Sequence, residues 1–214
     1  MLTGCDVSSL VTDRLCGQAG GRNASVACFY FNFAVRDEQS PTLVLGALLK
    51  QLVCGLEEIP EEVSLAYQRQ KDTFGGRGPQ LADIVKMMQS TASQKPIFIC
   101  IDALDECMAG YRIKLLNSLN KVLQRSPGTR VFLTGRPQVQ AEVEKRLTGR
   151  VNALHITPRS HDIISYLHSR LDEDATPDAM DTSLKADILE KIPQDISEMY
   201  IQATTSQELP QVIR

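Results

Sequence analysis

Pro96-Ile-Phe-Ile-Cys-Ile-Asp-Ala-Leu-Asp-Glu-Cys107 is the stretch that decides the fold, because an apolar run ends there in three carboxylates. The apolar residues from Ile97 to Ile101 predict a parallel strand that is buried on both faces. Such a strand delivers its last residue to the carboxyl edge of the sheet, where open α/β folds bind their ligands. We therefore expect Asp102, Asp105 and Glu106 at a ligand-binding edge.

An acid at that edge is placed to hold Mg²⁺ beside a nucleotide phosphate, which is the arrangement called Walker B. Asp102 takes the position nearest the metal, and the small Ala103 leaves room there. Asp105 or Glu106 would then orient or deprotonate an attacking water. A second interpretation stays open, because acids also favour the first turn of a helix, where they face the positive end of its dipole.

Strands and helices alternate through most of the chain. Further strands are predicted at residues 25–33, 130–134 and 151–156. Helices are predicted before and between them, at residues 6–16, 40–55, 60–74, 80–93, 111–125 and 139–147. This alternation predicts an α/β fold, with a parallel sheet like that of a P-loop NTPase and helices on both faces.

The pattern becomes entirely helical from about residue 160. Helices are predicted at residues 162–171, 183–191 and 195–203. We therefore divide the chain into an α/β core at residues 1–158, the start of a helical domain at 159–203, and a disordered tail at 204–214.

The acidic strand with Asp102, Ala103, Asp105 and Glu106 resembles the Walker B signature of NACHT-type STAND NTPases. Arg130-Val-Phe-Leu-Thr-Gly-Arg-Pro137 resembles the strand and the Arg-containing sensor 1 of the same family, with Gly135 where Ser is more usual. The chain is most similar to the NACHT modules of large fungal proteins with ankyrin or WD40 repeats, also described as nephrocystin-like N-terminal P-loop domains. The resemblance spans roughly residues 10 to 200 and includes Cys28-Phe-Tyr-Phe-Asn-Phe-Ala-Val-Arg-Asp37, Leu45-Gly-Ala-Leu-Leu-Lys-Gln51 and Ser197-Glu-Met-Tyr200.

This resemblance implies a signalling switch that binds ATP or GTP with Mg²⁺ and controls assembly. It implies that Asp102 lies on the metal side and that Asp105 and Glu106 are catalytic. It also implies that Arg136 senses the γ-phosphate, while Thr134 orients the same network through its hydroxyl. For Arg136 an ion pair to one of the acids is an equal alternative.

The phosphate-binding string of a P-loop, Gly-x-x-x-x-Gly-Lys-Ser/Thr, does not occur in this sequence. Its backbone amides cradle phosphate, its Lys neutralises charge and its hydroxyl reaches Mg²⁺. Gly17-Gln-Ala-Gly-Gly-Arg22 follows a helix and precedes a strand, which is the reverse of the order a cradle needs, so we expect a helix stop and turn. The chain is expected to be truncated before this Walker A motif, with nucleotide binding and hydrolysis impaired.

Composition is that of an ordinary globular protein, with 43% hydrophobic and 23% charged residues. A net charge of −3 offers no broad cationic surface for nucleic acid. No apolar run approaches the roughly 20 residues that span a bilayer, and the first residues do not form a secretion signal. The six cysteines form no Cys-x-x-Cys pair, which favours reduced thiols over zinc or disulfides. We expect a cytoplasmic protein without nucleic-acid or membrane partners.

Two classes of function follow. The chain is either a STAND regulatory NTPase module, whose enzyme activity is uncertain without Walker A, or a non-catalytic scaffold or protein-interaction fragment. A more distant third class is a metal-dependent hydrolase that uses the three acids without a P-loop. Nucleotide would be a partner if the P-loop were restored. Because the strand that feeds a P-loop is missing, we expect exposed apolar edges and either self-association or a protein partner.

Overall fold

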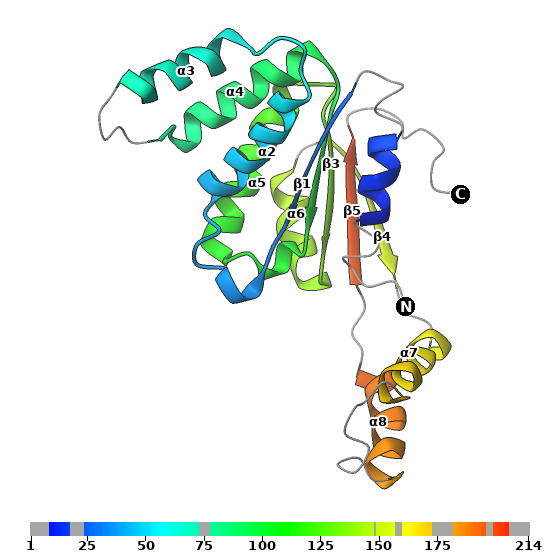
Figure 1. Ribbon diagram of the computed structural model, residues 1–214. Helices are drawn as coiled ribbons and strands as arrows, with labels where there is room; N and C mark the ends of the chain where they lie inside the picture. Colours follow the sequence, from blue (N-terminus) through cyan, green and yellow to red (C-terminus); the bar gives the residue numbers. More distant parts are fainter. Residues whose placement is uncertain are drawn as a thin grey trace.

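A five-stranded sheet with the order β1-β2-β3-β5-β4 forms the centre of the molecule. The computed structural model describes residues 9–17, 24–72, 78–147, 149–156, 160–172, 182–195 and 199–205. Three neighbouring strands are parallel to one another: β1 (Ser25–Tyr30), β2 (Ile97–Asp102) and β3 (Arg130–Gly135). The predicted α/β class is confirmed, because helices flank this parallel set (Figure 1).

One face of the parallel strands carries the main core (Figure 1). It is covered by α2 (Pro41–Cys54), α4 (Leu81–Gln94) and α5 (Ala109–Arg125). Helix α3 (Glu61–Asp72) packs outside α4, and α6 (Gln140–Arg146) packs beside α5. Short 3-10 turns are η1 (Phe33–Val35), η2 (Leu104–Glu106) and η3 (Pro137–Val139). The sequence predicted these α-helices to within a few residues of their ends.

Strand β1 ends at Tyr30, although the sequence predicted a strand to residue 33. The side chain of Asn32 accepts a hydrogen bond from the backbone N–H of Ala34 at 2.9 Å. Gln39 donates to the Asn32 carbonyl at 3.0 Å and accepts from the Asn32 N–H at 3.1 Å. These local bonds replace sheet pairing, so the chain turns into η1 instead of continuing the strand.

Helix α2 shows how the core is built from local signals. The Ser40 hydroxyl accepts from the backbone N–H of Leu43 at 3.3 Å, and Pro41 occupies the first turn, where its missing N–H costs nothing. Leu45, Leu48 and Leu52 then recur at helical spacing and are fully buried. Each such side chain contributes roughly 1.5–3 kcal/mol on burial. The apolar stripe therefore anchors α2 on the sheet.

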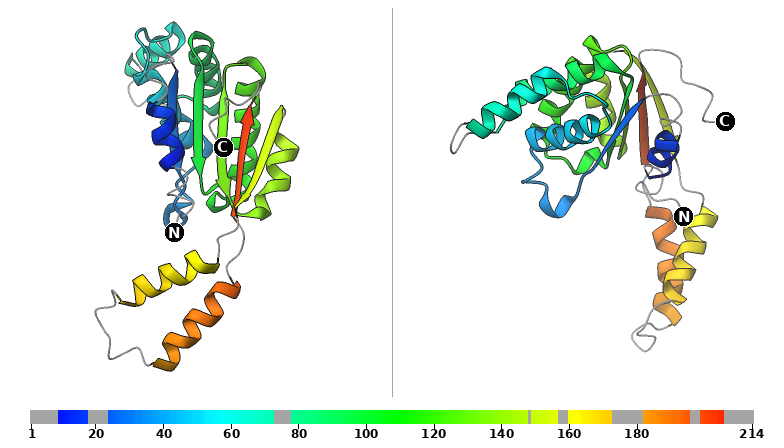
Figure 2. Two further views of the ribbon diagram at one scale, coloured as in Figure 1. Left: turned by 90° about the vertical axis from the view of Figure 1, so that its right-hand side faces the viewer. Right: turned by 45° about the horizontal axis from the view of Figure 1, so that its top comes forward.

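The opposite face of the parallel strands has a thinner cover. A helix formed by residues 9–17 lies over β1 (Figure 2), and its Thr12 is buried there. Phe98 and Phe132 on the same face stay half-buried. Helices thus lie on both faces as predicted, but unevenly. Of the helix predicted at residues 6–16, the first three residues lie outside the part of the chain that the structure describes.

Strand β4 (Arg150–Ile156) does not pair with β3, because β5 (Met199–Thr205) lies between them and is antiparallel to both. The helix predicted at residues 195–203 is therefore wrong. Helix α8 (Thr182–Asp195) ends at Asp195. The segment after it pairs through its backbone with β3 on one side and with β4 on the other, and local propensity alone does not identify such partners. The tail predicted from residue 204 begins inside β5, and residues 206–214 lie outside the described ranges.

Helices α7 (Ser160–Asp172) and α8 form a hairpin that we call the arm. The arm lies beyond one end of β4 and β5, away from α2, α4 and α5 (Figures 1 and 2). Lys185 of α8 and Asp172 of α7 form an ion pair at 3.1 Å, and Ile163 is buried. The helices predicted at 162–171 and 183–191 are confirmed. Over the residues described, no helix is both long enough and apolar enough to cross a membrane.

Candidate functional site

Parallel pairing of β2 with β3 brings the predicted site residues to one edge of the sheet. Cys100 lies opposite Phe132 and Ile101 opposite Leu133, so Asp102 at the end of β2 lies beside Thr134, the residue before the last one of β3. Arg136 follows β3 at the same edge, as the strand alternation predicted. We call residues 102–107 the acid loop.

Asp102 is held by a buried hydrogen-bond chain. The Thr134 hydroxyl donates to Oδ1 of Asp102, and the backbone N–H of Ala103 donates to Oγ1 of Thr134 at 3.1 Å. Only 3% of Asp102 and 2% of Thr134 is exposed. A buried carboxylate is costly unless it is hydrogen-bonded, and Thr134 supplies that bond within the protein.

The acid loop turns sharply at Ala103. Its φ of 53° lies in the left-handed region, which L-residues other than Gly, Asn and Asp rarely occupy. This conformation costs roughly 1–2 kcal/mol and starts η2. It directs the chain so that Leu104 enters the core, where only 1% of it is exposed. The burial of Leu104 and the bond to Thr134 offset the strain.

Asp105 binds Arg136 twice. The backbone N–H of Arg136 donates to Oδ1 of Asp105 at 3.1 Å, and Nε of Arg136 lies 3.4 Å from Oδ2. The side chain of Asp105 is 10% exposed and that of Arg136 is 66% exposed. Of the two roles expected for Arg136, the geometry contains the ion pair. A contact with phosphate stays a prediction.

The same contacts explain why Gly occupies position 135. A Cβ atom there would lie 3.1 Å from Cγ2 of Val139 and 3.3 Å from Oδ1 of Asp105. Both separations are tighter than ordinary carbon contacts. The departure from Ser therefore follows from the close approach of Asp105 to β3.

Glu106 holds a segment that is distant in sequence. Its Oε2 accepts a hydrogen bond from the backbone N–H of Phe33 at 2.9 Å, across 73 positions of the chain. The bond ties the acid loop to η1, which itself depends on Asn32. Sequence reasoning missed this partner, because a backbone donor leaves no residue-type signal. It also missed Asn32 and Gln39, whose only signal is a polar pair at the end of a strand.

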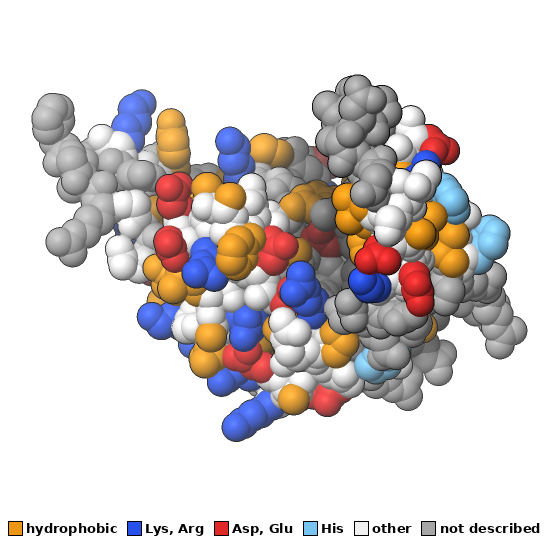
Figure 3. All heavy atoms as spheres, turned by 90° about the horizontal axis from the view of Figure 1, so that it is seen from below, with side chains coloured by type: hydrophobic (Ala, Val, Ile, Leu, Met, Phe, Trp, Pro, Cys, Tyr) orange, Lys and Arg blue, Asp and Glu red, His pale blue; other side chains and the backbone are white. Residues whose placement is uncertain are grey.

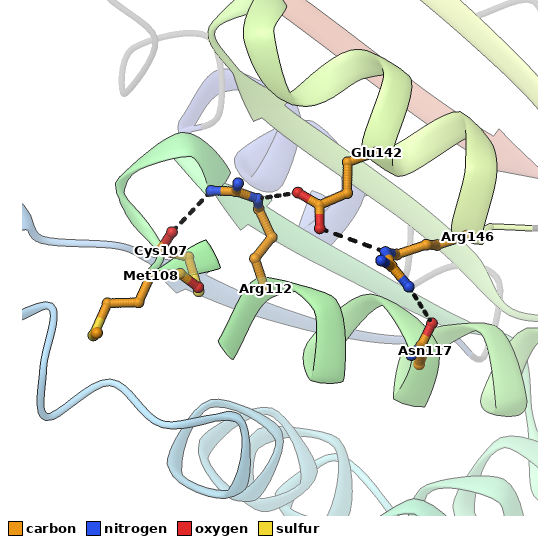
Figure 4. Close-up of polar contacts among 6 residues, drawn as sticks. All are labelled: Cys107, Met108, Arg112, Asn117, Glu142 and Arg146. Atoms are coloured by element: carbon orange, nitrogen blue, oxygen red, sulfur yellow. Dashed lines mark hydrogen bonds and ion pairs between the residues drawn. The ribbon is translucent and has the colours of Figure 1, made fainter. Parts of the chain in front are cut away.

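The end of the acid loop is held from α5 and α6 (Figure 4). Arg112 donates from Nη1 to the Cys107 carbonyl at 2.9 Å and pairs through Nε with Oε2 of Glu142 at 2.7 Å. Glu142 lies 3.4 Å from Arg146, which donates to Asn117 at 3.3 Å. This network fixes the loop against the helices. The sequence predicted both helices but not that they meet at these charges.

The cysteines behave as buried or free thiols. Burial raises the pKa of Cys107 to about 11 and the pKa of Cys100 to about 12, and it also raises the pKa of Cys28. A protonated thiol is a poor nucleophile, so Cys107 does not fit a catalytic role. Five cysteines fall within the described ranges, and all five are free.

The three acids do not converge on a common point. Asp102 accepts from Thr134, Asp105 from Arg136, and Glu106 from Phe33. In the described part of the chain, no three His, Cys, Asp or Glu side chains are grouped to hold a metal ion. The metal-dependent hydrolase interpretation therefore has no support from the geometry.

A family model described as "Nephrocystin 3, N-terminal" matches residues 7–136, which is more than half of the chain. The matched range contains the acid loop, Thr134 and Arg136, and it ends before β4. Comparison with curated proteins and with solved structures gave no match.

Proposed function

The chain belongs to the nephrocystin 3 N-terminal family, and from that premise we propose that it is a NACHT-type module of the STAND signalling NTPases whose nucleotide chemistry is impaired. In this proposal the module binds ATP or GTP weakly, turns it over near background and acts through assembly with protein partners in the cytoplasm. The free thiols of the described cysteines are compatible with a reducing compartment.

The ancestry half of the proposal rests on the arrangement of the sheet edge. A buried parallel strand ends at Asp102, its neighbour carries Thr134 one residue before its end, and Arg136 follows at the same edge. Ligands of open α/β sheets bind at the carboxyl ends of the strands. The sequence resemblance to NACHT modules supplies the expected ligand, which is a nucleoside triphosphate.

One observation carries the impairment half of the proposal. Each of the three acids expected to serve Mg²⁺ or water accepts a hydrogen bond from the protein itself. A carboxylate can accept further bonds, but turning Asp105 or Glu106 toward a ligand would break the bond that each makes here, at roughly 1.5–3 kcal/mol each. The sequence also contains no Gly-x-x-x-x-Gly-Lys-Ser/Thr string to neutralise phosphate.

The residues present fit Mg²⁺ and a triphosphate poorly. Mg²⁺ is usually bound through one or two carboxylates plus phosphate oxygens, and Asp102 with Thr134 is the part of the edge that matches this pattern. Asp105 and Glu106 point to Arg136 and Phe33 instead. We therefore assign these two acids a structural role, in which they join η1, β2 and β3 into one rigid edge.

A non-catalytic scaffold is the second candidate function. It is favoured by the bond between Glu106 and Phe33, because that bond uses a supposed catalytic acid to hold a surface turn. Phe33 and Val35 in this turn are exposed large apolar residues. In this alternative the acid loop shapes a protein-binding surface and has no nucleotide role.

Titration calorimetry with ATP and GTP in the presence of Mg²⁺, combined with phosphate release, tests the proposal on the full chain. We expect dissociation constants weaker than about 1 mM, equivalent to less than about 4 kcal/mol of binding. Glu106→Gln should leave turnover at background, as should Glu57→Gln, a control at an exposed residue outside the acid loop. Micromolar binding with turnover that Glu106→Gln abolishes and Glu57→Gln retains would overturn the impairment. Weak binding that rises steeply after a P-loop strand is fused in front of the chain would support the ancestry over the scaffold.

A further inference from the structure

Strands β3 and β4 run in the same direction but do not pair with each other, and a place one strand wide lies between them. We call this place the strand slot. Segment 199–205 fills it as β5, pairing from Tyr200 to Thr205 with β3 and from Met199 to Thr205 with β4. A strand inserted in the slot therefore forms main-chain hydrogen bonds with β3 along one edge and with β4 along the other.

We propose that the strand slot is a strand-exchange site that accepts β5 from a second copy of this chain. In the resulting dimer each chain donates its arm and β5 to the other. The slot recognises β5 through main-chain pairing, and β5 of a second copy offers the same pairing in the same register. Exchange of an identical element is a low-cost route to a dimer, because the bonds within the slot are conserved.

The position of the arm makes the exchange geometrically simple. Helices α7 and α8 pack mainly against each other. In Figures 1 and 2 they lie beyond the end of the sheet, and the core of α2, α4 and α5 lies elsewhere. Moving the arm to a second copy therefore leaves the buried core intact.

The arm also carries apolar surface that a second arm would cover. Ile164, Tyr166, Leu184 and Ile192 are 38–47% exposed, and hydrophobic side chains lie among charged and histidine side chains on the arm in Figure 3. Exposed apolar surface of this kind marks interaction sites when it is contiguous. A second arm packed along α8 would cover Leu184 and Ile192, which are eight positions apart on that helix, and would favour the exchanged dimer over two closed monomers.

Charge does not oppose this arrangement. Acidic and basic residues are mixed along α8, where Asp187 and Lys191 form an ion pair at 2.7 Å. A second arm of the same sequence therefore meets both signs of charge. Strand exchange requires only main-chain pairing and the arm surface, and it does not depend on the proposed nucleotide chemistry.

Disulfide trapping between two differently tagged copies tests the exchange. One copy carries Asn152→Cys and the other Ala203→Cys, with Cys5, Cys16 and Cys54 replaced by Ser in both. Asn152 and Ala203 lie opposite each other in the β4–β5 pair. Directly opposed antiparallel positions place their Cα atoms about 4.5–5.5 Å apart, which a disulfide spans. The copies are co-expressed and oxidised with glutathione disulfide, and the linked heterodimer is measured on a non-reducing gel.

A matched control replaces Ala203→Cys by Met199→Cys in the second copy. Met199 lies opposite Ile156, four positions from Asn152 and roughly 13 Å along the strand. We expect at least about tenfold more heterodimer with Ala203→Cys than with Met199→Cys. A single chain with both Asn152→Cys and Ala203→Cys completes the design. Suppose that the disulfide forms within that single chain, but Ala203→Cys gives no more heterodimer than Met199→Cys when two copies are mixed. That result would overturn the exchange. Absence of both links would overturn it too, because β5 would then not occupy the slot.

Discussion

Strands β2 and β5 are both interior strands of the same sheet, with a neighbour on each side, yet they lie in different surroundings. Strand β2 buries Ile97, Ile99 and Ile101 completely against the helices of the core. Strand β5 lies antiparallel between β3 and β4, and the β4 residues from Asn152 to His155 are exposed. Buried side chains and main-chain pairing together hold β2, whereas β5 is paired through its main chain on both edges beside an exposed β4.

The largest difference between the two regions should appear when apolar side chains are shortened. Leu48→Ala removes a fully buried side chain of α2 from the core under the parallel strands. It should lower the free energy of unfolding by about 2–5 kcal/mol, since lost transfer energy and a cavity add. Leu154→Ala in β4 removes a side chain that is 49% exposed and should cost under about 0.5 kcal/mol. Urea unfolding followed by circular dichroism measures both, and equal losses would contradict the comparison.

Removing an ion pair should likewise cost more stability in the α/β core than in the arm. Arg112→Met leaves Glu142 with Arg146 as its remaining charged partner and releases the Cys107 carbonyl. We expect a loss of about 2 kcal/mol, because the pair is largely shielded from water.

The control for this prediction is Lys185→Met in the arm, which removes the pair with Asp172. That pair is well exposed, so the loss should stay below about 0.5 kcal/mol. Thermal melts of the two variants compare the effects. A larger shift for Lys185→Met would mean that the arm is held more tightly than its exposed contacts indicate.

The hydroxyl of Thr134 should contribute less to the free energy of unfolding than the Arg112–Glu142 ion pair does. Thr134→Val keeps the shape of the side chain but removes the acceptor of the Ala103 N–H and the hydroxyl that donates to Oδ1 of Asp102. The expected loss is about 1–2 kcal/mol. Thr134→Ser retains the hydroxyl and should recover most of the stability in the same urea assay. Equal losses for Val and Ser would show that packing, and not the bond to Asp102, decides the effect.

The smallest expected effect is the alkaline titration of Cys100. Burial raises the pKa of this thiol from 9.0 to about 12. Because the folded pKa is the higher one, the contribution of the buried thiol is fully present below pH 9 and is lost as the pH rises toward 12. All six cysteines precede residue 108 and the arm contains none, so this pH-dependent loss of stability comes from the part of the chain that forms β1 and β2.

Cys100→Ala should therefore lose less stability with rising pH than the unmodified chain. The difference between pH 8 and pH 9.5 should be on the order of 1 kcal/mol, from linkage with an unfolded pKa near 9. Urea midpoints at the two pH values give the measurement. Cys54→Ala serves as the control, because Cys54 is an exposed cysteine outside the sheet. Parallel pH dependence in Cys100→Ala and the unmodified chain would contradict the burial argument.

The candidate site was predictable only in part. The strand-final Asp102 and the post-strand Arg136 were expected at one edge, and the β2–β3 pairing puts them there. The pair between Arg136 and Asp105 was one of two stated alternatives. The Phe33 donor to Glu106 and the link from Arg112 to Cys107 were not predicted. Both involve backbone groups, which every residue carries and no motif marks.

The sequence by itself determined the α/β class, the parallel strands and the helices that cover them, because the period of apolar residues follows directly from strand and helix geometry. Ser40 and Pro41 likewise marked the start of α2. Only the tertiary structure decided that residues 199–205 form β5 and not the predicted helix. The segment contains strand-favouring residues in Tyr200, Ile201 and Thr204, but a strand forms only where partners are present, and β3 and β4 supply those partners in the folded molecule.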